Sequence, residues 1–91
     1  MSKFHVKDTF ELPDRKLFVM AGSIVEGEIH AGMFVHIAFN SSSATTARIY
    51  SIEFARRRGG EDVCLCIEAD PELAEVMRDL NISDETCEVT I

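Results

Sequence analysis

Hydrophobic and polar residues alternate along much of this chain, which is the pattern of strands with one buried face. Phe4 and Val6 share one side of the first run, while the residues between and after them face the other side. Val35, Ile37 and Phe39 form a similar stripe near the middle of the chain. The runs that predict strands are residues 3–12, 17–25, 33–39, 46–54, 61–69 and 87–91.

Turn-forming residues separate these runs. They occur around Pro13, between Gly27 and Gly32, in "NSSSATT" at residues 40–46, and in "RRRGGED" around Gly59 and Gly60. A spacing of roughly eight to twelve residues between turns is typical of an all-β sandwich or barrel. Six short strands favour a closed barrel, because closure removes the exposed hydrogen-bonding edges of a sheet.

One segment, "ADPELAEVMRDLNIS", breaks the alternation and predicts an amphipathic helix at about residues 71–80. Asp70 suits the N-cap, Pro71 suits the first helical position, and Asn81 suits a left-handed C-terminal cap. The apolar residues at helical spacing are Leu73, Val76, Met77 and Leu80. We expect this stripe to cover an open end of the barrel.

The composition indicates one compact domain spanning residues 1–91, with 46% hydrophobic and 27% charged residues. No run reaches the roughly 20 apolar residues that cross a bilayer, and the start "MSKFHVKDTF" lacks the apolar segment of a secretory signal. We therefore expect a cytoplasmic protein that does not bind membranes. The formal charge of −7 disfavours non-specific binding to nucleic-acid phosphates, DNA included.

Only a local basic patch would reverse that repulsion. The candidate is the cluster Arg56, Arg57 and Arg58, with Arg48 and the pair Arg15 and Lys16. Arginine offers paired hydrogen bonds to phosphate or carboxylate, and neighbouring glycines let a partner approach the backbone closely. The alternative is a solvated basic loop that Glu61 and Asp62 balance.

Phe34 and His36 are further candidates for a partner-binding surface. Both lie opposite the predicted inward stripe of their strand, so we expect them to face solvent. Exposed aromatic residues are enriched at interface hot spots, although a single exposed Phe is also ordinary on a protein surface.

The three cysteines predict reduced thiols rather than disulfides, because their number is odd and small. Cys64 and Cys66 share one face of a strand, whereas a zinc site prefers "C-x-x-C" with two further ligands. We therefore expect no metal and no cofactor.

A cysteine nucleophile would need a histidine beside it in space. The candidates are Cys64, Cys66 and Cys87 with His5, His30 and His36. His30 lies in a predicted turn and His36 on a predicted surface, and no spacing in the chain supports such a pair. Buried, unreactive thiols are the ordinary alternative, and we predict no catalytic residue.

The order of several motifs resembles the second domain of translational GTPases of the elongation factor Tu type. The motifs are "F-x-V-x-D-x-F-x-L-P-x-R", "AGSIVEGEIHAGMFVHI", "SIEF" and "GGEDVCLCIE", within residues 4–67. Gly22, Gly27, Gly32 and Val35 stand at the intervals of that family. The resemblance implies a six-stranded β-barrel, which family members use to contact their nucleotide-binding domain, ribosomal RNA or the acceptor end of a charged tRNA.

The glycines of this pattern also have physical reasons of their own. Gly22 permits a sharp bend at a barrel corner, and Gly27 and Gly32 suit positive φ in the turns around Ile29, which we expect to be a buried hook.

Other positions depart from the family pattern. Lys16 and Cys64 replace glycines, and Ser23 and Val25 replace charged residues, which favours contact with protein over contact with RNA. The chain has no "G-x-x-x-x-G-K-[ST]" motif, so it is no GTPase by itself.

Together these observations predict an all-β fold. We expect a closed six-stranded, Greek-key-like β-barrel of the translation-protein type, with one short helix before the last strand. The predicted function is a non-enzymatic binding module that docks on a protein or ribonucleoprotein partner, within the translation machinery or beside a separate GTPase. The alternative is a small cysteine-based enzyme or thiol redox sensor.

Overall fold

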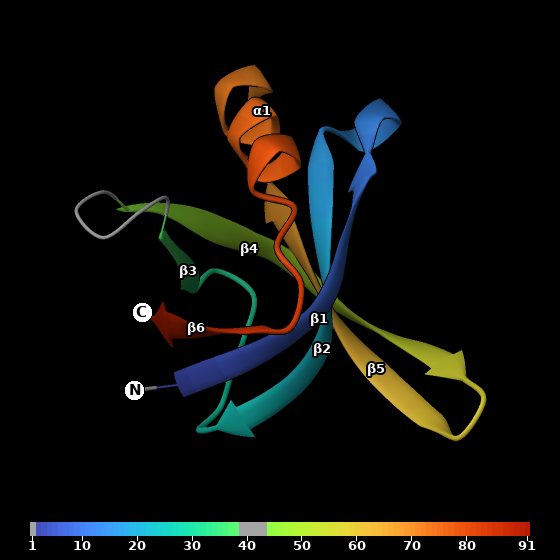
Figure 1. The fold of residues 1–91 in the computed structure, drawn as a ribbon. Coiled ribbons are helices and arrows are strands. Elements are labelled where there is room, and N and C mark those ends of the chain that lie inside the picture. The colour runs from blue at the N-terminus through green and yellow to red at the C-terminus, as the bar shows by residue number, and fades with distance from the viewer. Residues whose placement is uncertain (1, 39–43) are drawn as a thin grey trace.

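The computed structural model describes residues 2–38 and 44–91. Its elements are β1 (Ser2–Leu12), the 3-10 turn η1 (Pro13–Arg15), β2 (Leu17–Glu26), β3 (Phe34–Ala38), β4 (Ala44–Arg57), β5 (Gly60–Glu68), α1 (Pro71–Leu80) and β6 (Glu85–Thr90). All paired strands are antiparallel, and the pairing closes into a ring in the order β1-β2-β5-β4-β3-β6 (Figure 1). This confirms a mostly β fold of six antiparallel strands with one short helix.

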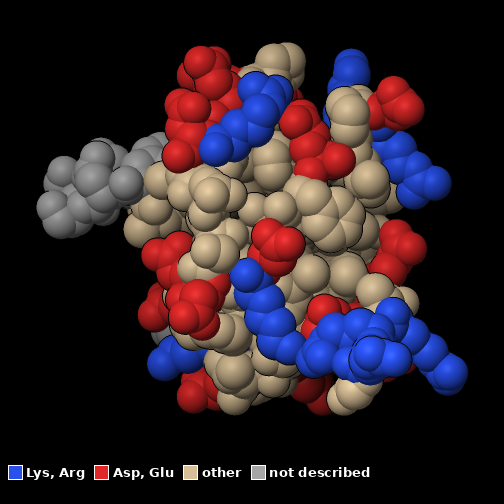
Figure 2. All heavy atoms as spheres, turned by 45° about the vertical axis from the view of Figure 1, so that its right-hand side comes forward, with Lys and Arg blue, Asp and Glu red and all other residues tan. Residues whose placement is uncertain are grey.

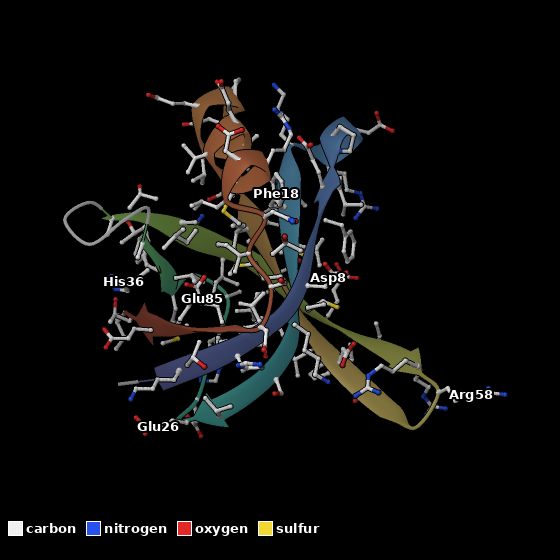
Figure 3. The ribbon with its side chains drawn as sticks, in the orientation of Figure 1. Asp8, Phe18, Glu26, His36, Arg58 and Glu85 are labelled. Carbon is white, nitrogen blue, oxygen red and sulfur yellow. The ribbon has the colours of Figure 1, made fainter. Side chains whose placement is uncertain are left out.

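The hydrophobic core fills the inside of this ring. Phe4, Val6, Val35 and Ile37 are fully buried there, which confirms the predicted inward stripes of β1 and β3. Phe18 points into the same interior from β2 (Figure 3). Each fully buried side chain of this size contributes about 1.5–3 kcal/mol of transfer free energy. Phe39, which extends the predicted stripe, lies outside the described residues.

Helix α1 lies at one end of the ring and has the predicted bounds (Figure 1). A side-chain oxygen of Asp70 accepts a hydrogen bond from the backbone N–H of Leu73 at 2.8 Å, and Asn81 takes the left-handed conformation with φ 47°. Met77 is fully buried in the core, so the helix covers this end of the ring as expected. The most buried positions are Ala74 and Met77, whereas the other residues of the predicted stripe are half-buried.

The strand boundaries of the β4–β5 hairpin differ from the predicted ones. The sequence predicts a wide turn around "RRRGGED", but Arg56 and Arg57 belong to β4 and only Arg58 and Gly59 form the loop. Gly59, the second residue of the loop, has φ 88°, a backbone conformation that favours glycine. The loop predicted at residues 40–46 is also shorter: β4 begins at Ala44, and residues 40–43 lie outside the described residues.

A bulge in β4 changes which side chains face the core. Ile49 pairs with Ile67 and Ser51 pairs with Cys66, so Tyr50 has no partner of its own in β5. The extra residue shifts the alternation, and Ile52 therefore packs against the same core as Ile49.

The structure shows a reason for glycine at position 22 of β2 that the sequence pattern does not reveal. Gly22 lies opposite Val6 of β1, beside a bulge at Lys7, and a side chain there would collide with the backbone carbonyl oxygen of His5. Close approach of two strands, rather than a special backbone angle, therefore requires glycine here. Gly27 and Gly32 have φ of 73° and 94°, and Ile29 between them is buried, as predicted.

We predict that Gly22→Ala destabilises the protein by more than about 2 kcal/mol, because backbone atoms of β1 must move to admit the methyl group. Gly60→Ala is the matched control, since its nearest neighbour is the flexible side chain of Arg57 at 3.6 Å. We expect the control to change stability by less than about 1 kcal/mol. Urea unfolding followed by circular dichroism measures both, and equal losses would contradict the assigned contact.

Candidate functional site

The end of the β4–β5 hairpin is the candidate site, and we call residues 53–62 the arm. The arm projects beyond the ring at the lower right of Figure 1. Residues 53–61 are all exposed, because β5 pairs with β2 only from Val63 onward. Figure 2 shows Lys and Arg gathered at this corner, on a surface that elsewhere carries many Asp and Glu side chains.

One face of the arm is held by a network of charges. The Nε of Arg57 donates a hydrogen bond to Oδ1 of Asp62 at 2.8 Å, and the Nζ of Lys7 approaches the same oxygen at 3.3 Å. The hydrogen bond from Arg57 is the main cause that lowers the pKa of the Asp62 carboxyl. This network links the arm to the bulge of β1, and it supports the expectation that Asp62 balances the arginine cluster.

The other face of the arm carries Arg56 beside an exposed aromatic residue. Phe54 is two positions before Arg56 on the same side of β4, and 65% of its surface is exposed. Within the described residues, neither Arg56 nor Arg58 forms an ion pair. Figure 3 places Arg58 at the tip, pointing away from the ring. Two guanidinium groups of the arm are therefore available to bind carboxylate or phosphate.

Phe34 and His36 lie elsewhere, where β3 meets β6. This junction consists of only two residue pairs, Phe34 with Thr90 and Val35 with Val89. The Nε2 of His36 and the Oγ1 of Thr90 share a hydrogen bond at 2.7 Å. Phe34 and His36 are half-buried rather than fully exposed as expected, because both take part in this junction.

The structure does not bring the predicted site residues together. His36 and Arg58 lie on opposite sides of the molecule (Figure 3). Arg15 lies in η1, beside the end of β5 that is away from the arm. Together with Tyr50 and Asp70, it lines an open hollow of about 710 Å³. The predicted residues thus fall into two separate groups, the arginines of the arm and the pair Phe34 and His36 at the β3–β6 junction, with Arg15 apart from both.

The three cysteines are buried and unbridged. Cys64 and Cys66 lie with Leu17, Val19 and Ala21 in a second apolar cluster, and burial raises the pKa of both thiols. Cys87 belongs to the main core, where burial, together with the Glu85 carboxylate, raises its pKa to about 11.

The histidines have partners other than cysteine. His5 contacts Thr86 at 3.1 Å and Asp84 at 3.0 Å. His30 lies 3.5 Å from a Glu28 oxygen and is exposed, as predicted for a turn. Across residues 2–38 and 44–91, no group of three or more His, Cys, Asp or Glu side chains is placed to hold a metal ion.

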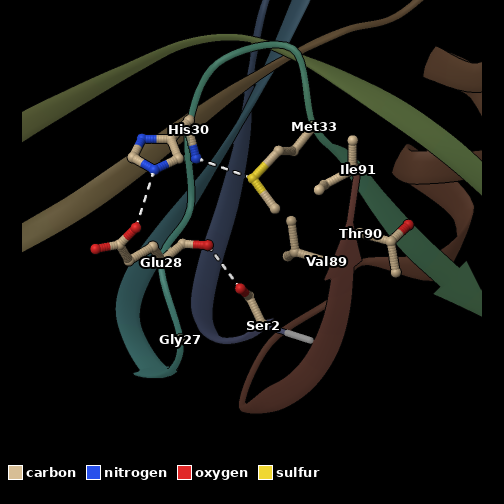
Figure 4. A pocket seen from close by; sticks show the side chains of 8 residues that line it. All are labelled: Ser2, Gly27, Glu28, His30, Met33, Val89, Thr90 and Ile91. Atoms are coloured by element: carbon tan, nitrogen blue, oxygen red, sulfur yellow. Dashed lines mark hydrogen bonds and ion pairs between the residues drawn. The ribbon is translucent and has the colours of Figure 1, made fainter.

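A second hollow, of about 630 Å³, lies between the β2–β3 connection and β6 (Figure 4). Its polar groups bond to one another: the Ser2 hydroxyl donates to the Glu28 carbonyl oxygen at 2.6 Å, and the His30 N–H donates to the Met33 sulfur at 3.2 Å. The Ser2–Glu28 bond attaches the connection to β1, and the His30–Met33 bond lies within the connection.

No family model, curated protein or solved structure matches this chain. In the described part of the protein, no helix has the length and apolar character needed to cross a bilayer.

Phe54 and Tyr50 are the most exposed aromatic residues of the described structure, and the alternation of the sequence does not mark them as surface residues. They are 65% and 59% exposed, although both lie in a run that predicts a half-buried strand. The signal for them is the spacing of Ile49 and Ile52, which cannot share one face of a regular strand. A bulge between these isoleucines resolves the conflict and leaves Tyr50 outside.

We predict that His36→Ala weakens the β3–β6 junction by about 0.5–1.5 kcal/mol, because it removes the bond to Thr90. Thr90→Val should cost a similar amount, and the double variant should lose less than the sum of the two. His30→Ala, at an exposed position, is the control with an expected loss below about 0.5 kcal/mol. Additive losses in urea unfolding would show that the two side chains are not coupled.

Burial of Cys87 predicts a fall in stability at alkaline pH. Its folded-state pKa is raised from 9.0 to about 11, so only the unfolded thiol deprotonates between these values. The stabilising contribution is complete below pH 9 and should decrease by about 2 kcal/mol near pH 10.5. Comparing the pH dependence of unfolding in the native chain and in Cys87→Ala isolates this group. A thiol that reacts rapidly in the folded protein near neutral pH would contradict the assigned environment.

Proposed function

We propose that this protein is a non-enzymatic binding module that docks on a partner through the arm. The observation that carries the proposal is the cluster Arg56, Arg57 and Arg58 at the tip of an exposed hairpin, in a chain with a formal charge of −7. A basic tip on an acidic body orients the protein toward negatively charged surfaces and speeds productive encounters.

The proposed architecture is a closed, Greek-key-like β-barrel of the translation-protein type. The ring of six antiparallel strands and the sequence pattern of Gly22, Gly27 and Gly32 support this assignment. The resemblance to the second domain of elongation factor Tu-type GTPases is the basis for proposing a partner in the cytoplasmic translation machinery or a separate GTPase.

We favour a protein partner over RNA. One of the three arginines of the tip is already bonded to Asp62, and Glu53 and Glu61 also lie on the arm. These carboxylates repel a continuous phosphate backbone but allow contact with a few carboxylates on a protein surface.

A thiol enzyme or redox sensor is the second hypothesis, and the environment of the cysteines argues against it. A reactive cysteine is accessible and has a lowered pKa, whereas all three thiols here are buried with raised pKa values.

We predict that replacing Arg56, Arg57 and Arg58 together by Ala reduces partner capture at least roughly tenfold, because the charge-assisted contacts are lost. The experiment passes cytosolic extract over the immobilised native protein and the triple variant, and mass spectrometry identifies what each retains. The matched control replaces Lys3, Lys16 and Arg48 by Ala, which removes the same charge away from the arm.

Treatment with ribonuclease and a salt titration distinguish a protein partner from RNA. Capture that survives ribonuclease and falls gently with salt indicates a protein, whereas loss with ribonuclease and a steep salt dependence indicate RNA. Equal capture by the native protein, the triple variant and the control would contradict a function of the arm.

A further inference from the structure

Strand β4 is longer than the strands that flank it, which leaves part of one edge without a partner. On one side, β3 pairs with β4 only from Ala44 to Arg48. The backbone of Ile49 still bonds to the segment before β3, through its N–H to Met33 and its carbonyl to Gly32, both at 2.8 Å. Beyond Ile49, no described strand pairs with this side of β4, and residues 53–57 are exposed (Figure 1).

The register of the hairpin identifies which backbone groups face this edge. Arg57 and Gly60 flank the two-residue loop, and such a loop is closed by a hydrogen-bonded pair. Antiparallel pairs alternate between those that bond to each other and those that point their N–H and C=O groups outward. The outward-pointing residues of β4 in the arm and at its base are therefore Ile52, Phe54 and Arg56.

This edge has some features of a protected edge but lacks a cover. Natural edge strands are commonly blunted by charged residues, bulges or a covering segment. Glu53, Arg56 and the bulge at Tyr50 are of the first two kinds, but no described strand covers residues 53–57. Here Phe54 is an exposed aromatic residue in the middle of the unpaired stretch, with Ile52 before it and Arg56 after it on the same face. An exposed aromatic side chain beside a row of outward backbone groups makes a template for another extended segment.

We infer that the free edge of β4, residues 52–56, binds an extended acidic segment of a partner protein by adding it to the sheet as a strand. The inference deepens the proposed function, on which it rests, because it specifies how the partner is recognised. Backbone hydrogen bonds to Ile52, Phe54 and Arg56 supply the pairing. A carboxylate near Arg56 and Arg58 and an apolar side chain beside Phe54 supply the selectivity.

Charge distinguishes this occupant from a second copy of the chain. Two copies each carry a formal charge of −7, so edge-to-edge pairing would bring two acidic bodies together. An acidic segment from another protein instead meets the arginines of the tip, two of which have no ion pair in the described structure. RNA lacks the alternating donors and acceptors of a peptide backbone, which the edge matches.

The test selects short peptides from a displayed random library on the full-length protein and follows amide hydrogen exchange by NMR. We expect the selected peptides to alternate apolar and polar residues and to carry Asp or Glu toward the end that lies at the hairpin tip. The synthesised peptide should slow exchange at Ile52, Phe54 and Arg56 at least roughly tenfold. The amides of Ala55 and Arg57, which face β5, should change little.

Variants distinguish the contribution of the backbone N–H groups to peptide binding from the contribution of the side chains. Phe54→Pro removes one outward N–H without breaking the ladder to β5, and it should weaken peptide binding at least roughly tenfold. Phe54→Thr keeps the N–H and should retain more binding. Arg56→Glu should weaken binding similarly, whereas Lys16→Glu, next to the end of β5 that is away from the arm, should not. The dispersion of the NMR spectrum verifies that each variant folds.

Several results would overturn the inference. These are a library that yields no binder, a peptide that protects other amides, undiminished binding by folded Phe54→Pro, and protection of the edge by self-association without peptide. Another is a partner that depends on the arginines and yet binds Phe54→Pro and the native protein equally tightly. That result would rule out strand addition and leave the proposed function standing. Conversely, the extract experiment contradicts the proposed function if the triple arginine variant captures as much as the native protein. Strand addition at the edge would still stand if the peptide binds as before.

Discussion

Closure of the strand ring at the β3–β6 junction is the constraint on which the rest of this structure depends. The junction has only two residue pairs, so its backbone hydrogen bonds, at about 0.5–1.5 kcal/mol each, contribute little. Val35 and Val89 face each other there and are both fully buried, which contributes about 1.5–3 kcal/mol for each side chain. Apolar burial therefore holds the ring closed, and the His36–Thr90 bond fixes the alignment of the two strands.

Closure also determines where recognition is possible. Inside the ring, side chains are committed to packing, and every strand has a neighbour on each side. Strands β1 and β2 extend beyond one neighbour, because β6 pairs with β1 only to Val6 and β5 pairs with β2 only to Gly22. Strand β4 likewise has more residues than β3 can cover. The surplus length forms the arm, whose residues contribute almost nothing to the core. Sequence in the arm is thus free to serve binding without a loss of stability.

The sequence predicts the local features of this fold well and the long-range ones less well. The Asp70 cap and the spacing of Leu73 to Leu80 define α1 because a helix is stabilised by neighbours in the chain. The full length of β4 depends on pairing with β5, so alternation within one strand cannot reveal it. The bulge at Tyr50 leaves one local signal, the spacing of Ile49 and Ile52, but its position is defined only by the register with β5. Gly22 is similar: its requirement comes from β1, which lies against it only after folding.

Rigidity explains why the arm is suited to bind rather than merely to project. An isolated two-stranded hairpin is only marginally stable in water. Here β5 continues into the ring, and the contacts of Asp62 with Arg57 and Lys7 attach the base of the arm to β1. Each exposed ion pair is weak by itself, but together they restrict the orientation of the hairpin. Because the strand edge is ordered before the partner arrives, less conformational entropy is lost on binding, and a short contact surface can support a specific complex.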